Sequence, residues 1–167
     1  ELTATDVFYI DPARRGTGNR RMFALSDCEP DIVQLLPAML RKAPKVIAKL
    51  SPMLDLSHTL ALLPQTTDVH VVSVKNECKE LLFVLRRGNA AKIPRIHCIN
   101  IMTDSSEQAF CFTPAEEQAT PVLPAKSAGA YLYEPNASIL KAGAYKQTAL
   151  RTGVRKLHVN SHLYTSD

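Results

Sequence analysis

The chain has 167 residues, which allows one ordinary domain or one small domain with an appendage. Hydrophobic residues make up 46% and charged residues 22%, so long disorder and collagen-like repeats are excluded. No apolar run approaches the roughly 18 residues that a membrane-spanning helix needs, so such a segment is not expected. The net charge of +4 permits a nucleic-acid partner without requiring one. The chain opens on Glu1, without Met or a signal peptide, and its cysteines show no zinc or disulfide spacing; a piece of a longer, reduced cytoplasmic protein is expected.

The first predicted element is a strand over residues 7–10, a continuous apolar run typical of a strand buried on both faces. It ends at Asp11-Pro12, and an Arg- and Gly-rich loop is predicted over residues 13–21. Gly16-Thr17-Gly18 does not make a dinucleotide-binding loop, because Arg21 stands where the last glycine is needed.

A helix is predicted from Asp31, its N-cap, to Ala43-Pro44, with Pro37 expected to kink or interrupt it. The following elements are a strand over residues 45–50, a short helix through Leu56, Leu60 and Leu63, and strands over residues 69–74 and 81–85. Only Lys75 to Glu80 separates the last two strands, so we predict an antiparallel hairpin.

The order β-α-β-α-β-β predicts an α/β fold with a parallel sheet and right-handed crossovers, to which the hairpin adds an antiparallel edge strand. After a boundary near residue 90, short strands are expected over residues 96–102 and 109–113, followed by a loop over 114–129. A strand over 129–133, a helix of about 14 residues between Asn136 and Gly153, and a strand over 157–164 complete the chain.

Polar side chains follow two of the predicted strands where those strands end. Asp11-Pro12-Ala13-Arg14-Arg15 follows the first, and Lys49-Leu50-Ser51-Pro52 ends the second. Ligands of open α/β sheets bind beyond the carboxyl ends of parallel strands. An aspartate there can accept a proton, and arginines offer planar forks for phosphate. The alternative is that Asp11 only caps its loop.

These strand ends, together with Val71-Val72-Ser73-Val74-Lys75-Asn76-Glu77-Cys78-Lys79-Glu80, resemble the second half of a class I S-adenosylmethionine-dependent methyltransferase. The Asp-Pro pair matches the fourth motif of that family, in the loop after its strand 4. Residues 1–90 would then be the C-terminal half of a Rossmann-like domain, with strands 4–7. Residues 91–134 resemble the ferredoxin-like element, and residues 135–167 the THUMP-like domain, of a bacterial group of these enzymes.

The resemblance implies S-adenosylmethionine as cofactor and RNA, with tRNA as the specific candidate, as substrate. It gives catalytic roles to Asp11 and Pro12. Substrate-binding roles fall to Arg14, Arg15, Lys49, Ser51, Glu77 and Lys79. The basic clusters provide candidates for RNA phosphate contact, namely Arg20, Arg21, Arg151, Arg155 and Lys156; a solvated face is the alternative for both clusters.

The family's glycine-rich cofactor loop and the acidic residue of its strand 2 have no counterpart in this sequence. We therefore expect the chain alone to bind the cofactor poorly and to be inactive. The strand end Lys49-Leu50-Ser51-Pro52 contains no cysteine, so a covalent enzyme intermediate is not expected. The mechanism that remains is direct methyl transfer, with Asp11 as hydrogen-bond acceptor or base. The missing strands would leave an unpaired sheet edge that allows self-association.

Four further residues have structural interpretations of equal or greater weight. Glu77 and Lys79 could form an ion pair that fixes the hairpin. His158 and His162 have a zinc-compatible spacing only on a helix, whereas a strand is predicted there, so no metal is expected.

The alternative function for the whole chain is a non-catalytic RNA-binding protein that keeps a degenerate methyltransferase sheet as its scaffold.

Overall fold

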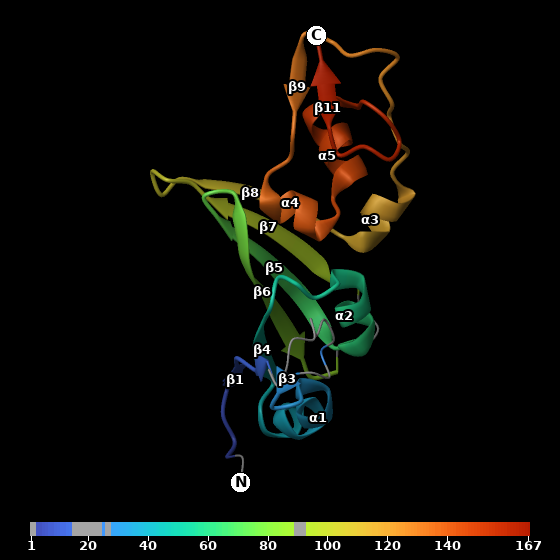
Figure 1. Ribbon diagram of the computed structural model, residues 1–167. Coiled ribbons are helices and arrows are strands. Elements are labelled where there is room, and N and C mark those ends of the chain that lie inside the picture. Colours follow the sequence, from blue (N-terminus) through green and yellow to red (C-terminus); the bar gives the residue numbers. More distant parts are fainter. Residues whose placement is uncertain (1–2, 15–24, 26–27, 89–92) are drawn as a thin grey trace. The chain divides into compact units, whose positions relative to one another are not determined.

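The computed structural model describes residues 3–14, 25, 28–88 and 93–167 (Figure 1). The chain forms two compact units, one made of Glu1–His70 and Lys79–Pro94, the other of Val71–Cys78 and Arg95–Asp167. Six strands form a mixed sheet in the order β1-β4-β6-β5-β7-β8. A small α+β region follows, so the predicted α/β class with a smaller C-terminal α+β domain is confirmed. The domain limits at residues 90 and 134 stay predictions.

The parallel pair at one side of the sheet is β1 (Val7–Ile10) with β4 (Lys45–Leu50), both as predicted. β6 (Glu77–Arg86) is antiparallel to β4 and lies between β4 and β5 (Thr66–Val74). The expectation that this hairpin strand would be an edge was wrong. β6 pairs with β4 on one side and β5 on the other, which places it inside the sheet, and its Leu81, Phe83 and Leu85 side chains are fully buried.

The prediction that β1 and β4 are buried on both faces was also wrong. In β4 the residues alternate, with Val46, Ala48 and Leu50 buried and their neighbours half-buried. Tyr9 of β1 is exposed. A continuous apolar run cannot by itself separate a one-sided from a two-sided strand, because β-branched residues are also common on half-buried faces.

The first helix, α1 (Ile32–Lys42), begins at Asp31 as predicted, whose carboxylate accepts from the N–H groups of the first turn. Of the two outcomes predicted for Pro37, a kink or an interruption, the interruption does not occur. The carbonyl that Pro37 leaves without a partner belongs to Val33, an exposed residue, so water can replace the lost hydrogen bond. α2 (Leu56–Leu62) follows β4, and α1 packs against β4. A short pair, β2 (Ala13–Arg14) with β3 (Cys28–Glu29), begins where only loop was predicted.

The β5–β6 turn is shorter than predicted and has only two residues. Lys75 and Asn76 both have positive φ, as the tightest hairpins require, and asparagine tolerates that conformation well. The backbone N–H of Asn76 is bound by the side chain of Asn100, which fixes the turn. The short turn lets β6 begin four residues earlier than predicted, at Glu77, whereas β5 ends at Val74 as predicted and is longer at its start, Thr66.

The longer segment of the second unit opens with β7 (Arg95–Ile101) and β8 (Glu107–Phe112), where strands were expected. The predicted loop after them contains α3 (Pro114–Ala119). No residue of α3 is buried, so periodicity gave no signal. The helix is instead stabilised at its start by a capping box between Thr113 and Glu116.

Two helices stand where one was predicted: α4 (Ala137–Ala142) and α5 (Tyr145–Thr152). Gly143 adopts a left-handed conformation and ends α4 in the middle of the stretch for which a single helix is predicted. The predicted cap at Asn136 and the predicted end at Gly153 are confirmed.

A three-stranded sheet completes the second unit in the order β10 (Arg155–Lys156), β11 (Tyr164–Ser166), β9 (Tyr131–Tyr133). The predicted strand over residues 157–164 was wrong, because most of that stretch is irregular and the strand begins at its end. Tyr164 is fully buried, and its hydroxyl donates to the carbonyl of Tyr145, which joins β11 to α5. Within the described residues, no helix is both long and apolar enough to cross a membrane.

Candidate functional site

Asp11 and Lys49 meet at the carboxyl ends of the parallel strands. The register pairs Ile10 with Ala48, so the residues that follow each of them lie side by side. Lys49 Nζ is 2.6 Å from Asp11 Oδ2, and each side chain is roughly half exposed. The sequence had singled out both residues, and the sheet brings them together in a direct ion pair.

The ion pair affects the titration of Lys49. The hydrogen bond to Asp11 raises the pKa of Lys49 above its usual value, and the charges of Asp11, Tyr9 and Glu80 act in the same direction, against the opposing effect of burial. Lys49 therefore stays an ammonium. The Asp11 carboxylate can accept a hydrogen bond or a proton, while Lys49 limits its orientation.

Other residues from the strand ends have local roles. Ser51 Oγ accepts from the N–H of Met53, and the Ser51 carbonyl accepts from the N–H of Leu54, so Ser51 forms the turn after β4. Pro12 is half-buried next to Asp11, and Arg14 pairs through its backbone with Cys28. Arg15, Arg20 and Arg21 lie outside the described residues. Glu77 and Lys79 are exposed near the start of β6, and their substrate role stays a prediction.

The second basic cluster divides into three different environments. Lys156 is 4% exposed, its Nζ donates to the carbonyl of Val159, and it lies over the Tyr145 ring. Desolvation lowers its pKa. This burial and these contacts disfavour a phosphate contact by Lys156. Arg155 is exposed, and the phosphate contacts of both residues stay predictions.

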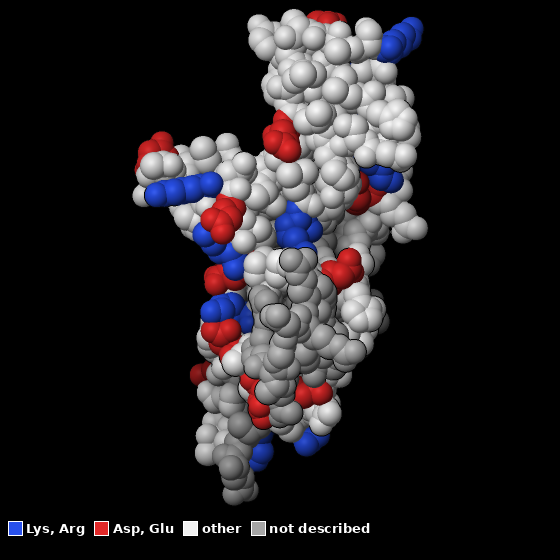
Figure 2. Space-filling view, in the orientation of Figure 1, with Lys and Arg blue, Asp and Glu red and all other residues white. Residues whose placement is uncertain are grey.

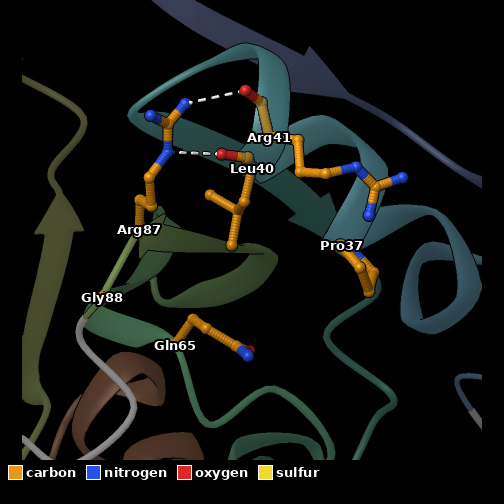
Figure 3. Close-up of a pocket in the computed structure, with 6 residues that line it drawn as sticks. All are labelled: Pro37, Leu40, Arg41, Gln65, Arg87 and Gly88. Carbon is orange, nitrogen blue, oxygen red and sulfur yellow. Dashed lines mark hydrogen bonds between the residues drawn. The ribbon is translucent and has the colours of Figure 1, made fainter.

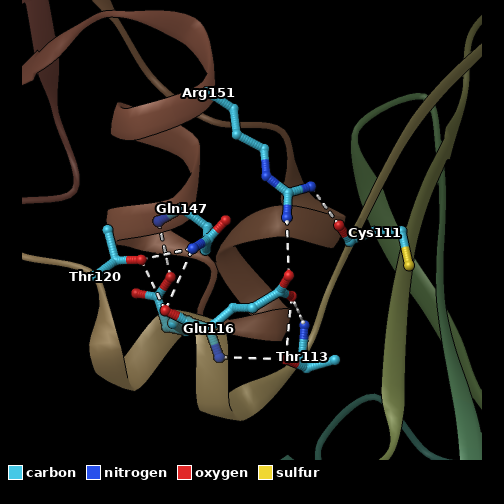
Figure 4. Close-up of polar contacts among 7 residues, drawn as sticks. Cys111, Thr113, Glu116, Thr120, Gln147 and Arg151 are labelled. Atoms are coloured by element: carbon cyan, nitrogen blue, oxygen red, sulfur yellow. Dashed lines mark hydrogen bonds and ion pairs between the residues drawn. The ribbon is translucent and has the colours of Figure 1, made fainter.

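Arg151 belongs to an internal network (Figure 4). Its guanidinium donates to the carbonyl of Cys111 at 2.5 Å, lies 3.8 Å from the Glu116 carboxylate and covers the Phe110 ring. Two hydrogen bonds from Thr113 lower the pKa of Glu116, so that carboxylate remains charged. Arg151 thus joins β8, α3 and α5, and its predicted phosphate contact would compete with these partners.

The histidines and cysteines have ordinary structural surroundings. His158 Nδ1 accepts from the N–H of Asn160, and His162 stacks on Tyr145. Cys78 is half-buried, and burial raises the pKa of its thiol, which fits the structural interpretation of this residue as a small hydrophobic side chain. Within the part of the chain that the structure describes, no three His, Cys, Asp or Glu side chains gather into a metal-binding group.

One cavity of the first unit was not predicted (Figure 3). It has a volume of about 420 Å³ and is lined by Pro37, Leu40, Arg41, Gln65, Arg87 and Gly88. Arg87 donates to the carbonyls of Leu40 and Arg41 at the end of α1. Its backbone N–H binds the carbonyl of Pro44, which precedes β4, so the cavity lies at the opposite end of β4 from Lys49. No periodicity or motif marks it in the sequence.

Comparison with known proteins gives one informative relative. A solved crystal structure of a "putative methyltransferase from Porphyromonas gingivalis W83" is 44% identical to this chain, with a TM-score of 0.85. The match covers 96% of this chain and 39% of that one. The chain is therefore homologous to that protein and spans well under half of its length. No curated protein matches the chain.

A family model described as a ferredoxin-like domain matches residues 131–167. This stretch contains β9, α4, α5, β10 and β11. The ferredoxin-like description thus belongs to the C-terminal region, which the sequence resemblance had given to a THUMP-like domain.

Proposed function

We propose that this chain is part of an S-adenosylmethionine-dependent methyltransferase that transfers a methyl group directly to RNA, with tRNA as the specific candidate. The observation that carries the proposal is the position of Asp11-Pro12. The pair stands at the carboxyl end of a parallel strand, in a sheet shared with the Porphyromonas gingivalis protein at 44% identity. Ligands of open α/β sheets bind at such ends.

The residues present fit one part of the cofactor. S-adenosylmethionine supplies an electrophilic methyl group on a positively charged sulfur, which an Asp11 carboxylate next to it would complement. The sequence contains no complete Gly-x-Gly-x-x-Gly loop, so the nucleoside and amino-acid ends of the cofactor would be held by other residues.

The proposed role of Asp11 is to orient the accepting nucleotide and to take its proton. The carboxylate is half exposed, so a substrate can reach it, and Lys49 holds one of its oxygens at 2.6 Å. β4 ends in Lys49-Leu50-Ser51-Pro52, which offers no cysteine nucleophile, and this supports direct transfer. Arg155, exposed in the second unit, remains a candidate for phosphate contact.

The test is the methylated nucleoside content of RNA from a strain that lacks the gene, measured by mass spectrometry. A single lost nucleoside, restored by the wild-type gene and not by one encoding Asp11→Ala, would support the proposal. Unchanged nucleosides would exclude RNA as the methyl acceptor.

The second candidate is a non-catalytic RNA-binding protein on a methyltransferase-like scaffold. The ion pair itself favours it, because Lys49 already occupies one oxygen of the Asp11 carboxylate that a substrate would need. Calorimetric titration of the full-length protein with S-adenosylmethionine separates the two. Binding favours the enzyme, and the absence of binding favours the scaffold.

A further inference from the structure

Three consecutive large side chains of β9 are exposed to solvent. Tyr131 is 60% exposed, Leu132 63% and Tyr133 42%. Side chains alternate along a strand, so the two tyrosines share one face and Leu132 points to the other. The tyrosine rings are tilted, with centroids 6.5 Å apart. Two neighbouring exposed rings on one strand are unusual on a soluble surface and mark an interaction site.

A cleft of about 410 Å³ adjoins this strand. Tyr133, Glu134, Thr148, Thr152, Tyr164 and Ser166 are among its lining residues. The hydroxyls of Thr148 and Thr152 donate to helix carbonyls, so their free lone pairs, together with the Glu134 carboxylate, present acceptors. Burial raises the pKa of Tyr164 to about 12, so this phenol stays neutral. An aromatic wall beside several acceptors suits a flat heterocycle that carries N–H donors.

The charge of the surrounding chain is compatible with a polyanion. Residues 120–167 contain six basic and two acidic side chains; of the basic ones, Lys156 is buried and Arg151 is held by partners within the fold, while Arg155 is exposed. A second hollow of about 350 Å³, lined by Lys126, Arg155 and Asp167, shares Ser166 with the cleft. In Figure 2 the surface over β9 and β11 is largely uncharged, with charged side chains at its margins.

We propose that Tyr131 and Tyr133 form a stacking platform for unpaired RNA bases, with the adjoining cleft receiving one base and Arg155 and Lys126 contacting the phosphates. Bases of single strands stack on exposed aromatic side chains, and a nearby cationic path holds the backbone. The choice of RNA rests on the proposed function, whereas the platform itself does not depend on methyl transfer.

The test is fluorescence anisotropy of the full-length protein with a labelled RNA of about 12 nucleotides, composed of A and C so that it cannot pair with itself. Tyr131→Ala with Tyr133→Ala should weaken binding at least about tenfold. The matched control is Leu132→Ala, equally exposed on the same strand, which should change affinity less than about twofold.

Phenylalanine at both tyrosine positions should restore binding, because the ring stacks and the hydroxyl of Tyr133 only contacts Ser166. This chain has five tyrosines, two of them in the platform, so the fluorescence quenching that RNA causes in the wild type should be reduced in the double alanine variant. Circular dichroism confirms that each variant is folded.

Three results would overturn the platform: wild-type affinity in the double alanine variant, an equal loss in the Leu132 variant, or equal affinity for the same RNA annealed to its complement. Methyl transfer is measured separately. If RNA is not methylated and the platform binds it, the proposed enzyme fails alone. If RNA is methylated and the tyrosine variants bind normally, the platform fails alone.

Discussion

Two carboxylate–cation pairs of the molecule have similar exposure and very different surroundings. Asp11 and Lys49 are 2.6 Å apart at the end of two strands, where the ammonium is the carboxylate's partner. Glu116 and Arg151 are 3.8 Å apart, yet Thr113 holds the carboxylate and the Cys111 carbonyl holds the guanidinium. A carboxylate held by one long flexible side chain can be shared with a ligand, whereas one held by a capping box is part of the scaffold.

The largest effect is expected on methyl-transfer activity, which should depend on Asp11 and not on Glu116. In the full-length protein, Asp11→Asn should reduce methyl transfer at least about 100-fold, because the amide can neither take a proton nor carry charge. Transfer of labelled methyl groups to RNA measures it. Glu116→Gln is the matched control and should stay within about twofold of wild type. Near-normal turnover of the Asp11 variant would remove this residue from the mechanism.

The next effect concerns stability around the second pair. Gln147 is buried, and its amide donates to Thr120 Oγ1 and to the carbonyl of Glu116. Gln147→Leu should cost about 2 kcal/mol, because both acceptors lose a buried partner. Urea unfolding measures this loss. Leu150→Ala, an exposed change on the same helix, should cost far less, and equal losses would show that the network is not specific.

Arg151 and Arg155 provide a similar test with a smaller effect. Arg151→Ala removes a hydrogen bond, a ring contact and a loose ion pair, for about 1 kcal/mol in the free energy of unfolding. Arg155→Ala should leave stability within about 0.5 kcal/mol. Equal unfolding midpoints of the two variants would contradict the scaffold role of Arg151.

Lowering the pH should weaken the Glu116–Arg151 pair, because the Glu116 carboxylate becomes protonated. Its pKa in the folded protein is lowered from 4.5, chiefly by the backbone N–H and then the hydroxyl of Thr113. A lowered carboxylate pKa stabilises the fold above the unfolded value, and the effect is lost as pH falls through the folded one. The stability difference between wild type and Glu116→Gln should therefore shrink as the pH is lowered below 4.5. A constant difference across that range would be inconsistent with this linkage.

The smallest effect is expected at Lys49. Exposed ion pairs contribute little to stability because water and salt screen them. Lys49→Met should leave the urea midpoint of the protein unchanged within experimental error. A clear loss of stability would mean that the first pair is also structural, and the distinction between the two carboxylates would disappear.

Local rules predicted much of this fold. The caps at Asp31 and Asn136 and the end at Gly153 depend on hydrogen bonds within one helical turn, so they can be read from neighbouring residues. The six-residue strand over Lys45–Leu50 was found because its apolar run is bounded by prolines. The helix after Pro114 was missed because it buries nothing, and the two-residue turn at Lys75 because asparagine and lysine there replace glycine.

By itself, the sequence determined the order of the longer elements from β1 to β6, the ends of several helices and the presence of an acidic residue where the first strand stops. Short-range capping, alternation and proline geometry suffice for these. Only the tertiary structure decided that β6 enters the sheet beside β4, that Lys49 reaches Asp11, and that Lys156 is buried while Arg155 is exposed. These outcomes depend on packing between residues far apart in the chain, and such contacts leave no local pattern.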